Sequence, residues 1–367
     1  MKNIGLYLHI PFCKTKCPYC DFYSMRGDES DRDMYTISLT ESMEEWADKV
    51  NVRADTLYFG GGTPSVLGAE SVAMLTRRAR QLFGVDGEIT VECNPSAVDD
   101  DFFKTVASEG VNRISLGVQS VIESERKKLG RFSDRKLIEK RIEQCLAAEI
   151  KNISLDVMLG VPDQTMSSLK ETLDFCVASP VTHISAYMLK TEEGTPYYKM
   201  RERLNLPDED MVADMYLAMS ERLNLNGFCH YEISNFAKPG FEGKHNLKYW
   251  NCEEYLGLGP SAHSFLGGKR FYYPRDIEYF KDGGKPIFDC DGGDEEEYIM
   301  LRLRLGEGII FEDFEKKYKK TFPSEIIKMS EKYISYGLMK KTEGSLALTE
   351  KGFMLSNSII ADLIRVV

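Results

Sequence analysis

Residues 4–22 read IGLYLHIPFCKTKCPYCDF, a short apolar run that leads directly into three closely spaced cysteines. The run predicts a buried strand, which Pro11 ends. Cys13, Cys17 and Cys20 follow with CxxxCxxC spacing, so one loop carries three thiols. In a chain without exported character, clustered cysteines indicate a metal centre or catalysis instead of disulfides. The stretch therefore predicts an inorganic centre at the carboxyl end of the first strand.

The cysteine spacing leaves the kind of centre open. A structural zinc ion needs four closed ligands, and His9 is available as the fourth. An iron–sulfur cluster held by three cysteines instead keeps one iron free for another ligand. From the spacing alone, zinc and iron remain alternatives.

Composition excludes several classes of protein. The chain has 367 residues, 43% of them hydrophobic, which is enough for a large core and more than one domain. Its 47 Lys and Arg against 58 Asp and Glu give a net charge of −11, so no nucleic-acid partner is expected. Neither a signal-peptide pattern nor an apolar run of membrane-spanning length is visible. The expected location is the cytoplasm.

Between residue 4 and about residue 236, apolar runs alternate with amphipathic stretches, as in repeated βα units. Helices are predicted over 31–50, 133–150 and 165–177. The predicted strands are IGLYLHI, TLYFG, EITVEC, RISLGV, ISLDVML and HISAYML. Because their most distinctive residues stand at the carboxyl ends, we expect an α/β fold with a partial (β/α)6 barrel, and a doubly wound sheet is the alternative.

Three domains are expected. Residues 1–236 form the barrel, and the Gly- and aromatic-rich residues 237–290 form an irregular region against its mouth. Residues 291–367 turn helical and end in a hairpin pattern, which indicates a helical, winged-helix-like domain. The acidity of the chain favours a packing or interaction role over DNA binding for this last domain.

The cysteine loop and seven other segments carry a resemblance. CxxxCxxC with an aromatic residue, Tyr19, before the last cysteine resembles the signature of radical S-adenosylmethionine enzymes. The segments YLHIPFC, TLYFGGGTPS, ECNP, NRISLGVQS, LGR, LDVMLGVPDQT, HISAYMLKTEEGTP and YEISNFAKPG are similar, in this order, to the family of oxygen-independent coproporphyrinogen oxidases and the HemW-type haem chaperones. Since they cover nearly the whole chain, the resemblance favours iron over zinc.

The resemblance implies a set of cofactor contacts. The three cysteines would hold three irons of a 4Fe-4S cluster, and S-adenosylmethionine would chelate the fourth through its amino and carboxylate groups. Glu92 would pair with the amino group and Arg131 with the carboxylate, as their chemistry allows. Taken singly, each polar residue is as well explained by an ordinary ion pair or cap. The other implied contacts are Gly61, Gly62 and Thr63 at the methionine end, Gln119 and Asp156 at the ribose, and Tyr7 beside the nucleotide.

Two departures from the oxidase pattern point to the chaperone branch of this family, which is the branch we expect. The oxidases continue their motif to CxxxCxxCxC, whereas position 22 here is Phe, and they carry an arm before the first strand, which in this sequence starts three residues from the beginning. Related chains also often have His where Ser133 stands, so no role is implied for that side chain. Oxidase activity on coproporphyrinogen III, by radical decarboxylation of propionate side chains, is therefore not expected but remains the first alternative. Whether the protein is an enzyme at all stays open.

The branch is further marked by HNxxYW, present as His245, Asn246, Tyr249 and Trp250. An imidazole can ligate haem iron and aromatic rings can cover a porphyrin, so the resemblance implies His245 as axial ligand with Tyr249 and Trp250 lining the haem. Chemistry alone favours a histidine in an exposed polar loop, and His263 is a weaker second candidate. The implied partners are acceptor haemoproteins, with membrane-bound respiratory enzymes, a peripheral membrane location and a homodimer left open. A cluster-dependent regulatory protein is the second alternative.

Overall fold

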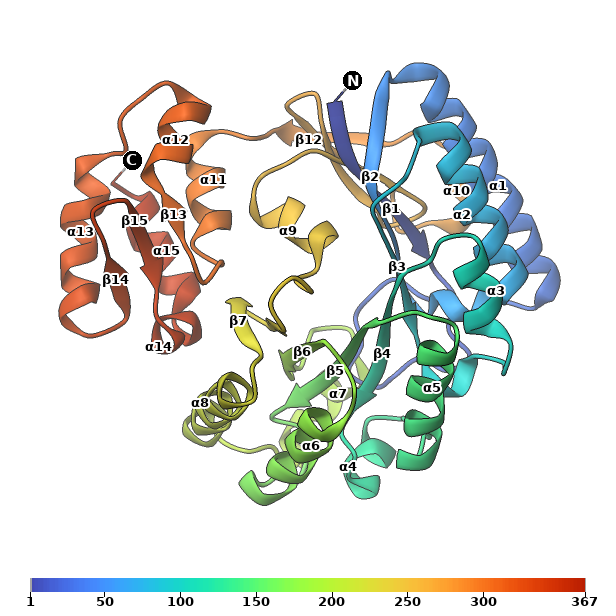
Figure 1. Ribbon diagram of the computed structural model, residues 1–367, viewed down its shortest axis with the longest axis horizontal. Coiled ribbons are helices and arrows are strands. Elements are labelled where there is room, and N and C mark those ends of the chain that lie inside the picture. Colours follow the sequence, from blue (N-terminus) through green and yellow to red (C-terminus); the bar gives the residue numbers. More distant parts are fainter. Residues whose placement is uncertain (1, 367) are drawn as a thin grey trace.

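The computed structural model describes residues 2–366. Six parallel strands form its centre, and Figure 1 shows how they are arranged. They are β1 (Lys2–Ile10), β2 (Val52–Gly61), β3 (Glu88–Cys93), β4 (Arg113–Gln119), β5 (Asn152–Leu159) and β6 (His183–Met188). Each strand pairs with the next in parallel, so the six predicted strands and their order are confirmed. The sheet curves into a partial barrel, and the expected fold class is confirmed.

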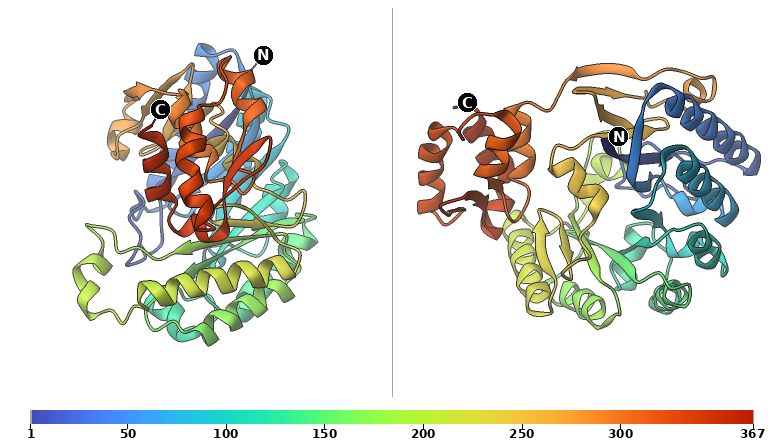
Figure 2. Two further views of the ribbon diagram at one scale, coloured as in Figure 1. Left: turned by 90° about the vertical axis from the view of Figure 1, so that its left-hand side faces the viewer. Right: turned by 45° about the horizontal axis from the view of Figure 1, so that its top comes forward.

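The two faces of this sheet differ in chemistry. In β1, Ile4, Leu6 and Leu8 are fully buried in the core, whereas Tyr7 and His9 point to the inside of the curve. Because side chains alternate along a strand, one face is apolar and the other polar. Helices cover the apolar face, as Figures 1 and 2 show: α1 (Glu29–Lys49), α2 (Ala69–Phe83), α3 (Phe102–Ser108), α4 (Glu123–Lys128), α5 (Arg135–Ala147), α6 (Met166–Ala178) and α8 (Glu209–Leu225). A polar barrel interior follows from this pattern.

The prediction of an irregular region over 237–290 is wrong. This segment contains the helices α9 (Lys244–Trp250) and α10 (Ile277–Lys281) and the strands β9 (Tyr255–Leu258), β10 (His263–Leu266), β11 (Lys269–Tyr272) and β12 (Ile287–Asp291). β9 runs parallel beside β1, and β10 to β12 extend the sheet antiparallel from there. The added strands satisfy backbone groups of β1 that would otherwise form an open edge.

On the other side, β6 is followed by the antiparallel strands β8 (Asn235–Ala237) and β7 (Cys229–Glu232), which complete a 12-stranded sheet. Between its two flanks lies α9, inside the curve (Figure 1). The Glu88 carboxylate accepts the backbone N–H groups of Lys244 and His245 at 3.1 and 3.0 Å. The Lys248 ammonium bonds to Asp55 at 2.9 Å. These contacts attach α9 to the amino-terminal ends of β2 and β3.

The C-terminal part combines helices with a small antiparallel sheet in the order β13-β15-β14. It consists of α11 (Glu295–Arg302), β13 (Ile309–Ile310), α12 (Phe311–Tyr318), α13 (Ser324–Ser335), β14 (Met339–Lys341), β15 (Ser345–Leu348), α14 (Glu350–Met354) and α15 (Ser356–Ile364). This agrees with the winged-helix-like expectation, while the three domain boundaries stay a prediction. None of the helices in residues 2–366 is long and apolar enough to cross a membrane.

Candidate functional site

The cysteine loop that follows β1 is fixed at both its base and its tip. At the base, the Cys13 N–H donates to the Met25 carbonyl at 2.9 Å and the Met25 N–H donates to Pro11 at 2.8 Å. At the tip, the Pro18 carbonyl accepts the N–H of Tyr197, at 3.0 Å, from the short helix α7 (Pro196–Met200). A loop held in this way keeps its three thiols over the carboxyl ends of the strands.

His9 stabilises this loop instead of joining its thiols. Its Nε2 lies 3.1 Å from the Tyr23 carbonyl, which can only accept, so Nε2 carries the hydrogen. Nδ1 then accepts from the Tyr7 hydroxyl at 3.1 Å. Both ring nitrogens of His9 are engaged in these hydrogen bonds, which argues against His9 as the fourth ligand of a zinc site.

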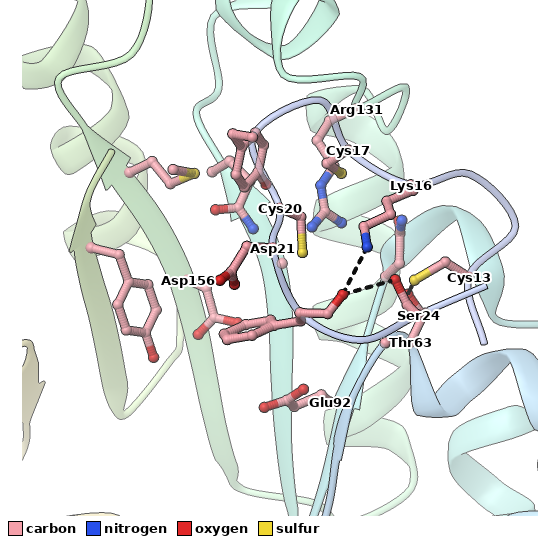
Figure 3. Close-up of a pocket in the computed structure, with 18 of the residues that line it drawn as sticks. Cys13, Lys16, Cys17, Cys20, Asp21, Ser24, Thr63, Glu92, Arg131 and Asp156 are labelled. Carbon is pink, nitrogen blue, oxygen red and sulfur yellow. Dashed lines mark hydrogen bonds between the residues drawn. The ribbon is translucent and has the colours of Figure 1, made fainter. Parts of the chain in front are cut away.

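A cavity of about 430 Å³ lies between the cysteine loop and the strand ends. Figure 3 shows Cys13, Cys17 and Cys20 on the loop side, facing Glu92 and Asp156 from the strands. All three cysteines and seven of the predicted nucleotide contacts line this cavity: Gly61, Gly62, Thr63, Glu92, Gln119, Arg131 and Asp156. Tyr7 does not line it and lies deeper in the barrel, with its ring stacked on Tyr58. Residues from four strands and three loops thus meet at one cavity.

The glycine stretch after β2 fits under the loop because it lacks side chains. The Gly62 N–H donates to Ile10 and the Thr63 N–H to Phe12, both at 2.8 Å. A Cβ on Gly62 would stand 2.7 Å from the Phe12 carbonyl oxygen. Gly61 adopts φ 107°, a conformation that favours glycine. The close approach brings the Thr63 hydroxyl to 3.3 Å from the Cys13 sulfur.

The donor set fits a cluster held by thiolates. All three loop cysteines are free thiols. Burial raises the pKa of Cys20, the Phe22 backbone counteracts this, and the nearby Cys17 and Cys13 raise the pKa further. Thiolates that repel one another in this way are stabilised by a cationic centre between them. Three such ligands around one cavity match a 4Fe-4S cluster with one iron left for another ligand.

Two carboxylates and one guanidinium line the cavity, and their chemistry suits the amino and carboxylate groups of a ligand. Burial raises the pKa of Glu92 to about 7, while the Tyr58 hydroxyl, which donates to its Oε1 at 2.8 Å, lowers it. Burial also raises the pKa of Asp156, which accepts from Ser115 at 2.8 Å. The Arg131 Nε is buried and has no hydrogen-bond partner in the described structure. An incoming carboxylate would satisfy that group.

Gln119 reaches the cavity because β4 is irregular at its end. A bulge interrupts the pairing with β5 between Gly117 and Gln119, and Gln119 itself has φ 67°. A non-glycine residue in this region carries backbone strain, which is common at functional sites. The bulge turns the Gln119 side chain toward the cavity.

Several residues that line the cavity were not predicted from the sequence. Tyr187, Met188 and Leu189 at the end of β6 form an apolar and aromatic wall, and Asn94 follows β3. A usable signal was present, because all four belong to HISAYML or ECNP and stand at strand ends. Tyr187 is 43% exposed and lines the cavity, so part of its side chain is accessible from there. Burial of its hydroxyl raises the pKa of Tyr187.

The structure does not bring the HNxxYW residues to this cavity, and the interpretation of His245 as part of an exposed loop is wrong. His245 belongs to α9 and is 0% exposed. Its Nδ1 lies 2.9 Å from the Thr56 hydroxyl and its Nε2 2.7 Å from the Tyr249 hydroxyl, so both nitrogens are engaged. Burial, together with the charges of Lys248 and Arg113, lowers the pKa of His245 to about 3. The imidazole packs in the barrel floor.

Comparisons with known proteins agree with this site. The Radical SAM superfamily matches residues 7–176, and the HemN C-terminal domain matches residues 295–355. Proteins named heme chaperone HemW are similar over nearly the full length. That of Lactococcus lactis is 36% identical over 98% of this chain and 96% of its own, and that of Bacillus subtilis 33% over 96% and 97%.

The Escherichia coli protein of the same name is 32% identical over 97% of both chains. Among solved structures, coproporphyrinogen III oxidase (HemN) from Escherichia coli superimposes with a TM-score of 0.85 at 20% identity, over 99% of this chain and 90% of that one. At this identity the oxidase shows the fold alone. The extended similarity to the chaperones decides the branch: this chain belongs to the HemW family of the radical SAM superfamily.

Proposed function

We propose that this protein is a haem chaperone that carries a 4Fe-4S cluster with S-adenosylmethionine, binds haem and passes it to acceptor haemoproteins. The observation that carries the proposal is the cavity in which three loop thiols face Glu92, Arg131 and Asp156. The names of the similar proteins supply the cargo.

In this proposal the chain's own residues bind and orient the nucleotide. When bound, the cluster supplies an iron to which amino and carboxylate groups can coordinate. Glu92 accepts hydrogen bonds from the amino group, and Arg131 donates to the carboxylate through its free Nε. Asp156 and Gln119 are available to the ribose hydroxyls.

Phe22 argues against the oxidase alternative. It lines the cavity where the oxidases have a fourth cysteine, and it is 64% exposed. We expect anaerobically reconstituted protein, given reductant and S-adenosylmethionine, not to convert coproporphyrinogen III. Accumulation of protoporphyrinogen in that assay would favour the oxidase alternative.

Haem coordination by His245 remains a proposal, and it requires α9 to move because the imidazole is buried and doubly hydrogen-bonded. Of the five histidines, His263 is the one exposed in the structure, and its ring stacks on Tyr272. Tyr249 and Trp250 would line the haem once α9 is displaced. His263 is the specific second candidate for axial ligand.

Titration of haem into wild type, His245→Ala and His263→Ala, followed by the Soret band, separates these ligands. We expect His245→Ala to lose the wild-type spectrum and His263→Ala to retain it. The opposite pattern would assign the ligand to His263. An unchanged spectrum in both variants would remove His245 and His263 as axial ligands.

Assembly and location complete the proposal. Membrane-bound respiratory enzymes are the proposed acceptors, which would place the protein at the membrane surface during transfer, and the proposed assembly is a homodimer. Size-exclusion chromatography with light scattering, with and without haem, tests the assembly. Co-sedimentation with vesicles that carry an acceptor enzyme tests the location.

A further inference from the structure

Tyr58, in the middle of β2, lies between Glu92 of the cofactor cavity and the side chains of the barrel floor. Its hydroxyl donates to Glu92 Oε1 at 2.8 Å. Its ring lies 6.1 Å from the Tyr7 ring and 5.2 Å from the His245 ring. Neither the cavity lining nor the sequence motifs single out this residue. Tyr58 therefore lies between the cofactor cavity and the buried His245.

The barrel provides a specific space for this contact. At Gly60, a Cβ would stand 3.0 Å from the rings of both Tyr58 and Tyr7 and 3.3 Å from Glu92 Oε1. Three side chains from three strands therefore meet over the missing side chain of one glycine. The stacked rings of Tyr58 and Tyr7 hold Tyr58 in one orientation, in which its hydroxyl donates to Glu92. This is the arrangement expected of a group that orients another.

Glu92 needs such a partner because its surroundings disfavour charge. Burial raises its pKa to about 7 and Asp156 adds to the effect, while the Tyr58 hydroxyl, the Gly61 backbone and Arg113 oppose it. The titratable and charged groups around it are Tyr7 on β1, Tyr58 on β2, Cys93 on β3, Arg113 on β4, Asp156 on β5, Tyr187 on β6 and Tyr249 on α9. Among them, Tyr58 is the side chain that donates a hydrogen bond directly to the Glu92 carboxylate.

We propose that Tyr58 is a positioning residue for S-adenosylmethionine, which holds the Glu92 carboxylate oriented and ionised for the amino group of the nucleotide. The inference rests on the role proposed above for Glu92. Loss of the hydroxyl leaves the ring stack intact but removes one donor from the carboxylate. Glu92 then keeps its proton to a higher pH, and a protonated carboxyl accepts the amino hydrogens less well.

The test measures dissociation constants for S-adenosylmethionine on anaerobically reconstituted wild type, Tyr58→Phe, Glu92→Gln and Tyr231→Phe, from about pH 6 to about pH 9. Tyr231→Phe is the matched control, because that buried hydroxyl bonds to His183 and the Gly243 backbone, away from Glu92. Ratios to wild type at each pH remove the titration of the nucleotide itself. Iron content and melting temperature confirm that each variant is folded and loaded.

We expect Tyr58→Phe to weaken binding about three- to tenfold near neutral pH, with a smaller loss at high pH, so that the midpoint of its pH profile moves up. Tyr231→Phe should follow wild type. A uniform loss at all pH values, or none, with Glu92→Gln still impaired, would overturn the role of Tyr58 alone. Normal binding by Glu92→Gln would instead overturn the role of Glu92, and that of Tyr58 with it.

Discussion

At the scale of single residues, the site depends on side chains that are missing as much as on those that are present. Gly60, Gly61 and Gly62 allow Tyr58, His9 and the Phe12 carbonyl, respectively, to approach the β2 backbone. The glycine run is visible in the sequence, but the group that packs against each glycine is not. Those neighbours depend on the register of β1 against β2, which brings His9 opposite Gly60.

Gly60→Ala tests this packing. Its backbone is outside the left-handed region, so the cost arises from the added methyl group against Tyr58, Tyr7 and Glu92. We expect a loss of about 1–3 kcal/mol in the free energy of unfolding and weaker binding of S-adenosylmethionine. Gly344→Ala is the control, because nothing lies within 4 Å of its added Cβ. Equal unfolding free energies for the two variants would contradict the account.

At the scale of elements, the regular βα units were predictable and the later segment was not. The strands over 4–10 and 183–189 and the helix over 165–177 were correct because their periodicity is local. β9 has only four residues and is stabilised by pairing with β1, about 250 residues earlier in the chain. A local sequence pattern cannot reveal such a distant pairing. The burial of His245 likewise depends on Thr56 and Glu88 from distant strands.

The cysteine loop is the element whose chemistry is most directly tested. Replacing any one of Cys13, Cys17 and Cys20 by Ala should abolish a cluster that otherwise contributes about four irons per chain, because each thiolate holds one iron. Cys229→Ala, an exposed thiol on β7, is the matched control. Iron and sulfide are quantified per chain after anaerobic reconstitution. Retained iron in the loop variants, or zinc without sulfide in wild type, would exclude this assignment.

At the scale of the whole molecule, the barrel and the C-terminal helices meet at the edge of the large sheet. Ile233 N–H donates to the Arg304 carbonyl, and Gly306 N–H donates to Tyr231, both at 2.9 Å. Glu232 lies between them, is 0% exposed, and has an Oε1 without a hydrogen-bond partner. Burial raises its pKa to about 7, against the opposing effects of Asn235, Ser234 and Arg304.

This carboxyl makes the junction sensitive to pH. The pKa of Glu232 is about 7 in the folded state and 4.5 in the unfolded chain. Its contribution to the free energy of unfolding is therefore fully present below about pH 4.5 and is lost as the pH rises through about 7. Glu232→Gln is neutral throughout, so relative to wild type it should gain roughly 2–3 kcal/mol in unfolding free energy between about pH 5 and about pH 8. Denaturant unfolding at the two pH values measures this. A difference between variant and wild type that does not change with pH would contradict it.

Haem transfer tests the central claim most directly. Reconstituted protein is loaded with haem, mixed with an excess of an apo-haemoprotein, and followed by the change in the Soret band. We expect about one haem per chain and its complete movement to the acceptor, with the cysteine-loop variants impaired in delivery. Failure to bind haem, or haem retained in the presence of excess acceptor, would contradict the proposal that this member of the HemW family is a haem chaperone.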